Sequence, residues 1–216
     1  MRVGVTGMTT GATIAALLAT GCARETPQLP TDPIDRAATC GIVAAATERE
    51  AAGVKGDLSA EAQGRIFQYP LLAASQGGAF DDATANAVFK RMPALSDKVV
   101  AGKWQTLRPA CAAAYPATRT TQPTLPSRPL DSMLQCYVMI DFMRKALGNQ
   151  GAAYNEATLR YGLLGTKLDA KVSPALARAG IRNGTALSRE RSEALAAAAK
   201  LGQPATVIDA CAKKYG

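Results

Sequence analysis

The chain has 216 residues, 48% of them apolar, which suits one large or two small folded domains and argues against a disordered protein. Its net charge is +8 and it contains no histidine, which excludes a Ser-His-Asp or Cys-His catalytic site, histidine-bound zinc and a histidine-ligated haem. The apolar residues are mainly Ala, Leu and Val, and aromatic residues make up only 5%, so packed helices are favoured over a β-sandwich.

Residues 1–21 are predicted to form an export signal. Arg2 precedes a short apolar run centred on residues 14–19, which is too short to span a bilayer as a stable helix. The run ends in Ala19-Thr-Gly-Cys22, which resembles a bacterial lipoprotein signal, where small residues precede the cysteine that becomes lipidated. This resemblance implies a lipid anchor on Cys22. The alternative is an ordinary signal cleaved after Ala23, which would discard Cys22.

Two segments are predicted to be connections without a core of their own. Residues 22–33 are polar and rich in proline, and we expect them to tether the rest of the chain to the membrane. Residues 117–130 are dominated by Pro and Thr and show no helical periodicity, which is typical of a linker. The remainder is thereby divided into a first unit, residues 34–116, and a second unit, residues 131–216.

The first unit is predicted to contain four helices, because capping residues and prolines mark their ends. These helices are expected over about 33–52, from Ser59 to a kink or stop at Pro70, from Asp81 or Asp82 to about Arg91, and from Ser96 onward, with Pro109 as a candidate break.

The second unit shows a similar series of start signals. Its helices are expected over about 131–147 and 155–168, in a short segment from Ser173, over about 188–201, and in a closing helix with Pro204 in its first turn. Strand signals are weak throughout both units. Four to five helices around one core form a small bundle, so the sequence predicts an all-α fold with two helical bundle units.

Four landmarks recur in the same order in both units, which favours an internal duplication with a period near 100 residues. They are a Cys in the first helix (Cys40, Cys136), a Tyr-x-Leu-Leu element (Tyr69, Tyr161), an Ala-Leu-Ser element (Ser96, Ser188) and a closing Cys-x-x-x-Tyr (Cys111 with Tyr115, Cys211 with Tyr215).

The cysteines are predicted to form structural disulfides. Five are present, and setting Cys22 aside leaves four in a chain expected to reach an oxidising compartment. Three pairings of four cysteines exist, and the duplication selects Cys40–Cys111 and Cys136–Cys211. A metal or redox site is the disfavoured alternative, because the chain has no Cys-x-x-Cys and no histidine.

Positive charge is concentrated in the second unit. Residues 131–216 carry twelve Lys and Arg against seven Asp and Glu, a balance of +5, whereas residues 37–116 carry eight against seven. A basic face there would suit phospholipid headgroups or an acidic protein. The alternative is an ordinary solvated surface. The residues in question are Lys167, Lys171, Arg178, Arg182, Arg189 and Arg191.

Two other residues qualify as candidates for a site. Asp141 would be a catalytic or ligand-binding carboxylate, but a pairing with Arg144 or Lys145, three and four residues away, is favoured. Trp104, the single tryptophan, would be an exposed interface residue, but a place in the core is favoured.

The sequence thus favours a cell-envelope lipoprotein that faces the periplasm and acts as a binding or structural module for a protein or an anionic envelope component. We expect no catalytic activity, cofactor, metal or nucleic-acid partner. One alternative is an envelope enzyme that uses carboxylates in a cleft between the units, and another is an inhibitor or immunity-type protein. With ordinary signal cleavage, the protein would be soluble in the periplasm or secreted.

Overall fold

The computed structural model describes residues 28–182 and 184–216, and this part of the chain contains helices and no strands. The all-α prediction is therefore confirmed. The predicted export signal, Cys22 and the start of the tether lie outside the described residues. The α-helices are α1 (Pro33–Ala52), α2 (Ala60–Ala74), α3 (Asp82–Ala101), α4 (Arg108–Ala114), α5 (Pro129–Gly148), α6 (Asn155–Arg178), α7 (Gly184–Ala199) and α8 (Pro204–Tyr215).

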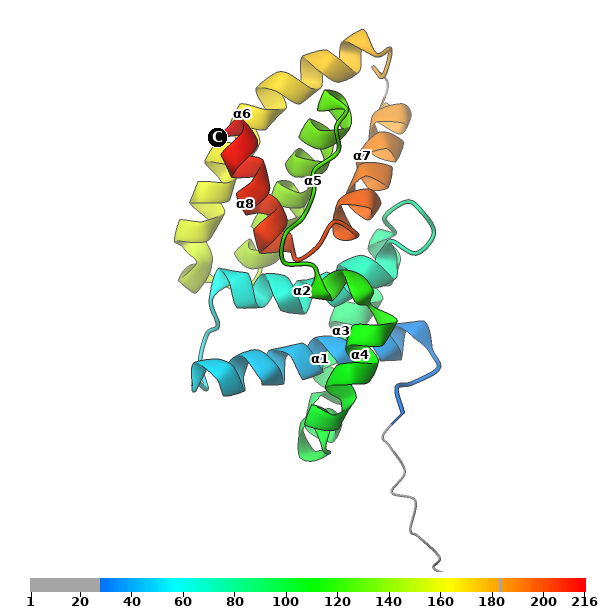
Figure 1. Cartoon of the computed structure of the whole chain (residues 1–216), viewed down its shortest axis with the longest axis vertical. Helices are drawn as coiled ribbons and strands as arrows, with labels where there is room; N and C mark the ends of the chain where they lie inside the picture. The colour runs from blue at the N-terminus through cyan, green and yellow to red at the C-terminus, as the bar shows by residue number, and fades with distance from the viewer. Residues whose placement is uncertain (1–27, 183) are drawn as a thin grey trace, which may run out of the picture.

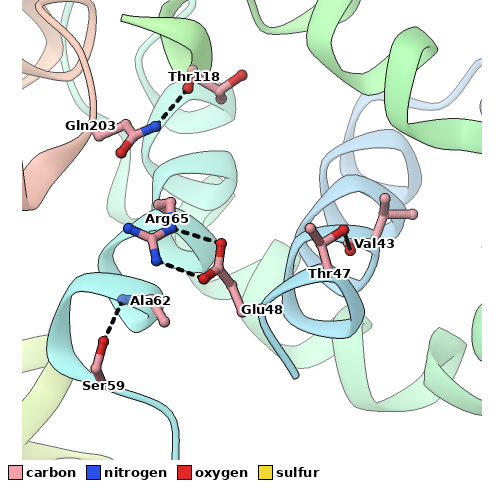
Figure 2. A network of polar contacts seen from close by, with 8 residues as sticks. All are labelled: Val43, Thr47, Glu48, Ser59, Ala62, Arg65, Thr118 and Gln203. Carbon is pink, nitrogen blue, oxygen red and sulfur yellow. Dashed lines mark hydrogen bonds and ion pairs between the residues drawn. The ribbon is translucent and has the colours of Figure 1, made fainter. Parts of the chain in front are cut away.

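Side-chain caps begin the first three helices where the sequence predicts them. The carboxylate of Asp32 accepts a hydrogen bond from the Asp35 amide (2.8 Å), and the Ser59 hydroxyl accepts one from the Ala62 amide (3.2 Å; Figure 2). Asp81 caps α3 in the same way. Each cap satisfies a backbone donor that has no partner within the helix, so the starts of these helices are determined locally.

The ends of the helices differ from the predictions at three prolines. α3 continues through Pro93 and past Ser96, and α6 continues through Pro174, so the breaks predicted at these two prolines are wrong. α2 continues through Pro70, which is therefore not a stop. α7 also begins four residues before Ser188. A proline inside a helix costs about 3 kcal/mol, and packing of the surrounding turns offsets this cost. Pro70 is fully buried, with Leu71 beside it.

In the first unit, α1 packs against both α2 and α3, and α4 lies across α1. A core cluster includes Val43, Tyr69, Val88 and Trp104, and the Tyr69 ring stands edge-on to Tyr115 at 5.3 Å between ring centres. A disulfide joins Cys40 in α1 to Cys111 in α4, as predicted. It connects the first helix of the unit to the last.

In the second unit, α6, α7 and α8 all pack against the central α5 (Figure 1). The second disulfide joins Cys136 in α5 to Cys211 in α8, which confirms the predicted pairing. The four sequence landmarks therefore lie on the first, second, third and fourth helices of each unit. The packing is not identical, because α5 contacts α6 most extensively whereas α1 contacts α3 most extensively.

One of the two buried hydrophobic clusters contains residues of both units. Figure 1 shows α2 between α1 and the helices of the second unit, and Ile66, Phe67 and Leu71 of α2 belong to the same buried cluster as Met143 of α5 and Ile208 of α8. This arrangement buries α2 on two sides.

Hydrogen bonds also cross the boundary between the units. The buried Gln68 amide donates to the Gly202 carbonyl (2.9 Å), and the Tyr154 hydroxyl donates to the Leu58 carbonyl (2.9 Å). The predicted linker takes part, because the side-chain amide of Gln203 donates to the Thr118 carbonyl at 3.1 Å (Figure 2). The start of the linker is therefore bound to the turn between α7 and α8.

We expect both disulfides to be closed in the folded protein and to be important for its stability. They span 71 and 75 residues, and the chain-entropy model assigns about 4 kcal/mol to closing loops of that length. The double variant Cys136→Ala, Cys211→Ala should therefore lose on the order of 10 °C in melting temperature. Alkylation of the denatured chain, followed by mass spectrometry, should modify these four thiols only after reduction. Modification before reduction would contradict the pairing.

We also expect Gly202 to be intolerant of a side chain. Its φ is +151°, which side chains disfavour, and a Cβ there would lie 2.7 Å from the Thr120 carbonyl oxygen. Gly202→Ala should lower the free energy of unfolding by about 1–3 kcal/mol in urea titrations. Gly56→Ala is the matched control, because Gly56 has no neighbour within 4 Å and its φ is not positive. Equal free energies of unfolding for the two variants would contradict the expectation that position 202 does not tolerate a side chain.

Candidate functional site

Three of the predicted basic residues lie on one side of α6. Lys167, Lys171 and Arg178 are separated by four and seven residues, which places them in register along the helix, and all three are exposed. The opposite side of α6 is buried through Leu168, Val172 and other apolar residues.

Two leucines extend this surface, and the sequence analysis did not single them out. The side chains of Leu159 and Leu163 are 70% and 71% exposed, the largest values among the exposed hydrophobic residues described. Helical spacing places them on the same side of α6 as the lysines. The surface is called here the α6 outward face and consists of Leu159, Leu163, Lys167, Lys171 and Arg178.

The end of α8 adds further positive charge beside this face. The Lys171 ammonium lies 5.9 Å from the centre of the Tyr215 ring, and the Lys214 ammonium lies 5.4 Å from it. The Tyr215 hydroxyl and Lys214 both hydrogen-bond to Ser132, whose side chain is buried, at 2.8 and 3.2 Å. The closing Tyr of the second unit is thereby fixed by a hydrogen bond, with two ammonium groups near its ring.

The other three basic residues are placed differently. Arg182 follows α6 and donates to the Ala177 carbonyl at 3.1 Å, and Arg189 on α7 pairs with Glu193 at 3.7 Å. Arg191 is half-buried, with its guanidinium 5.2 Å from the centre of the Tyr137 ring of α5. α6 and α7 lie on different sides of α5 (Figure 1), so the six residues are divided between two surfaces.

Asp141 forms the ion pairs that its spacing predicts. Its carboxylate accepts from Arg144 at 2.8 Å and lies 2.7 Å from the Lys145 ammonium. Burial raises the pKa of Asp141, but hydrogen bonds from Lys145 and Arg144 outweigh this effect and hold the pKa below its ordinary value of 3.8. A general acid needs a raised pKa, so this environment suits an ion pair rather than proton donation.

A cavity of about 470 Å³ is lined by residues of both units. Phe80 and Asp82 line it from the first unit, and Phe142 and Lys145 from the second. Asp82 is the one carboxylate among the lining residues, whereas an enzyme that uses carboxylates in this cleft would need more than one there. A smaller cavity of about 370 Å³, within the second unit, has Asp169 and the paired Asp141 in its wall.

The remaining candidate residue, Trp104, belongs to the core. Trp104 is 8% exposed and packs within the first-unit cluster, as favoured by the sequence.

Across residues 28–182 and 184–216, no group of three or more Cys, Asp or Glu side chains is arranged to hold a metal ion. None of the helices in this part of the chain is long and apolar enough to cross a membrane.

Comparison of the chain with protein-family models, curated proteins and solved structures finds no match. Function is therefore inferred from the residues and their geometry.

We expect the ion pairs of Asp141 to make the free energy of unfolding depend on pH in the acid range. Since the pKa is lowered in the folded state, the stabilisation is present above pH 3.8 and is lost as pH falls through the folded pKa. Asp141→Asn should therefore be less stable than wild type near pH 6, with a difference in free energy of unfolding that shrinks as the pH falls below 3.8. Urea titrations at a series of pH values measure this, with the exposed Asp57→Asn as control. A difference independent of pH would contradict it.

Proposed function

We propose that the protein is a lipoprotein of the bacterial cell envelope that faces the periplasm and binds a protein or an anionic envelope component. The α6 outward face is the binding surface in this proposal. The observation that carries it is the combination of three aligned cations with two leucines that are about 70% exposed on one helix side.

This combination has the chemistry of a binding surface. Single exposed leucines are common, but Leu159 and Leu163 lie one helical turn apart and are continuous with a row of cations. Apolar contacts would supply affinity, and the charges would attract and orient an acidic partner. The net charge of +5 on the second unit would also attract an acidic partner.

The export and anchoring part of the proposal rests on the signal and on the cysteines. The sequence around Cys22 resembles a lipoprotein signal, and two closed disulfides are typical of an oxidising compartment such as the periplasm. In Figure 1, α6 reaches the end of the long axis opposite the half where the described chain begins. A domain anchored through its N-terminus would therefore extend α6 away from the anchor, towards a partner outside the anchoring lipid layer.

We further propose that the two units arose by internal duplication. The landmarks occupy corresponding helices, and each disulfide joins the first helix of its unit to the last. The α6 outward face lies on the second copy, so the binding surface belongs to that copy in this proposal. Inhibitor or immunity-type proteins would use the same kind of surface and differ only in their partner. The single carboxylate in the cavity between the units supports a binding module over an enzyme.

The proposal is tested by crosslinking in intact cells followed by recovery through a C-terminal tag. We expect a discrete partner with the wild-type chain, and about tenfold lower recovery with Lys167→Glu, Lys171→Glu, Arg178→Glu, because three cations become anions on the binding surface. Cys22→Ala should also lower recovery, because the chain would no longer be anchored.

The matched control is Lys55→Glu, Lys90→Glu, Lys103→Glu, which changes the same net charge at exposed positions of the first unit. Recovery with this control should equal that of wild type, and the melting temperatures should show that both triple variants are folded. Equal recovery with the two triple variants, or no partner with wild type, would overturn the proposal.

A further inference from the structure

A cavity of about 530 Å³ lies among the first three helices, away from the α6 outward face. Each helix contributes residues at helical spacing, so three apolar stripes converge on one space. The lining comprises residues 42, 45, 46 and 49 of α1, residues 63, 66 and 67 of α2, residues 89, 92, 93, 96 and 100 of α3, and Trp104 and Gln150.

The interior of this cavity is apolar and adaptable in shape. Ile42, Ile66 and Phe67 form buried parts of its wall, and Met92, a flexible side chain, lies against Gly41. Val100 is 48% exposed, so the lining reaches the surface. Cavities that bind small ligands have volumes of about 300–1,000 Å³ and a mainly apolar lining with a few polar groups, and this one has both properties.

One charged group, Arg49, lines the cavity, and no carboxylate does. The carboxylates next to it in the sequence have other partners. Glu48 accepts two hydrogen bonds from Arg65, at 2.6 and 2.7 Å (Figure 2), and Glu50 pairs with Arg108. The Arg49 guanidinium is exposed and has no ion-pair partner among the described residues, so its charge is available to a ligand.

We propose that this cavity binds a fatty acid, with the aliphatic chain among α1, α2 and α3 and the carboxylate on Arg49. A single cation at an apolar cavity matches a ligand with one negative charge at the end of an apolar chain. The guanidinium can donate two parallel hydrogen bonds to a carboxylate, which gives this headgroup an advantage over a neutral one.

An aromatic pair is shared by this cavity and a neighbouring one. Phe67 and Phe89 stand edge-on with their ring centres 5.6 Å apart, and both also line the neighbouring 470 Å³ cavity between the units. The same two rings therefore line both spaces, and the aliphatic chain of a bound fatty acid would contact them.

Trp104 provides an intrinsic reporter, because it is the single tryptophan and lines the cavity. The full chain is titrated with dodecanoate below its micelle concentration, by calorimetry, and with a brominated fatty acid, which quenches tryptophan on contact. We expect saturable binding of dodecanoate, weaker binding of the neutral dodecanol, and quenching of Trp104 by the brominated ligand.

Arg49→Gln should weaken dodecanoate binding about tenfold and leave dodecanol binding unchanged, because only the carboxylate uses the guanidinium. Arg182→Gln, an exposed arginine outside the cavity, is the matched control and should bind like wild type. Ala46→Phe, which fills the cavity, should abolish binding while its melting temperature shows a folded chain.

Three outcomes would overturn the proposal: no saturable binding to the wild-type chain, equal affinity of Arg49→Gln and wild type for dodecanoate, or full binding by the folded Ala46→Phe variant. The proposal is independent of the one for α6. The variant with glutamate at positions 167, 171 and 178 should still bind dodecanoate, so failure of one proposal is distinguishable from failure of the other.

Discussion

The structure depends on the burial of α2 on two sides. Tyr69 and Ala73 of this helix belong to the core of the first unit, whereas Phe67 and Leu71 belong to the cluster shared with the second. Burial of apolar side chains is the main favourable contribution to folding, so neither unit has a complete core without this helix. The hydrogen bond from Gln68 to the Gly202 carbonyl satisfies the buried amide nitrogen at the same boundary. α2 thereby sets the position of the basic second unit relative to the cavity in the first.

Much of the fold was predictable because local signals determine it. Asp32 and Ser59 satisfy backbone donors within a few residues, and the cysteine pairing followed from the repeat of landmarks around Cys40 and Cys136. The errors concern the helix interiors at prolines, such as Pro93. A proline removes a donor locally, but whether the helix continues depends on packing with distant residues, which periodicity does not reveal.

The candidate surfaces were less predictable for a similar reason. The positive charge of the second unit could be counted, but its division between α6 and α7 depends on how both helices pack on α5. Arg191 lies over Tyr137 because of that packing. Arg49 looked like any charged residue in a polar stretch of α1. Within the part of the chain that the structure describes, its guanidinium is left without an ion-pair partner because the neighbouring carboxylates, Glu48 and Glu50, pair with Arg65 and Arg108. Both of these arginines are distant from Arg49 in sequence, so the sequence alone does not reveal the pairing.

The position of α2 in the chain also determines when each of its two sides can be buried. Synthesis proceeds from the N-terminus, so Cys111 is available to Cys40 well before Tyr154, Gly202 and Gln203 exist. Phe67 and Leu71, on the other side of α2, have no cover from the second unit at that stage. The apolar side of α2 to which they belong is buried only after α5, α7 and α8 have been made.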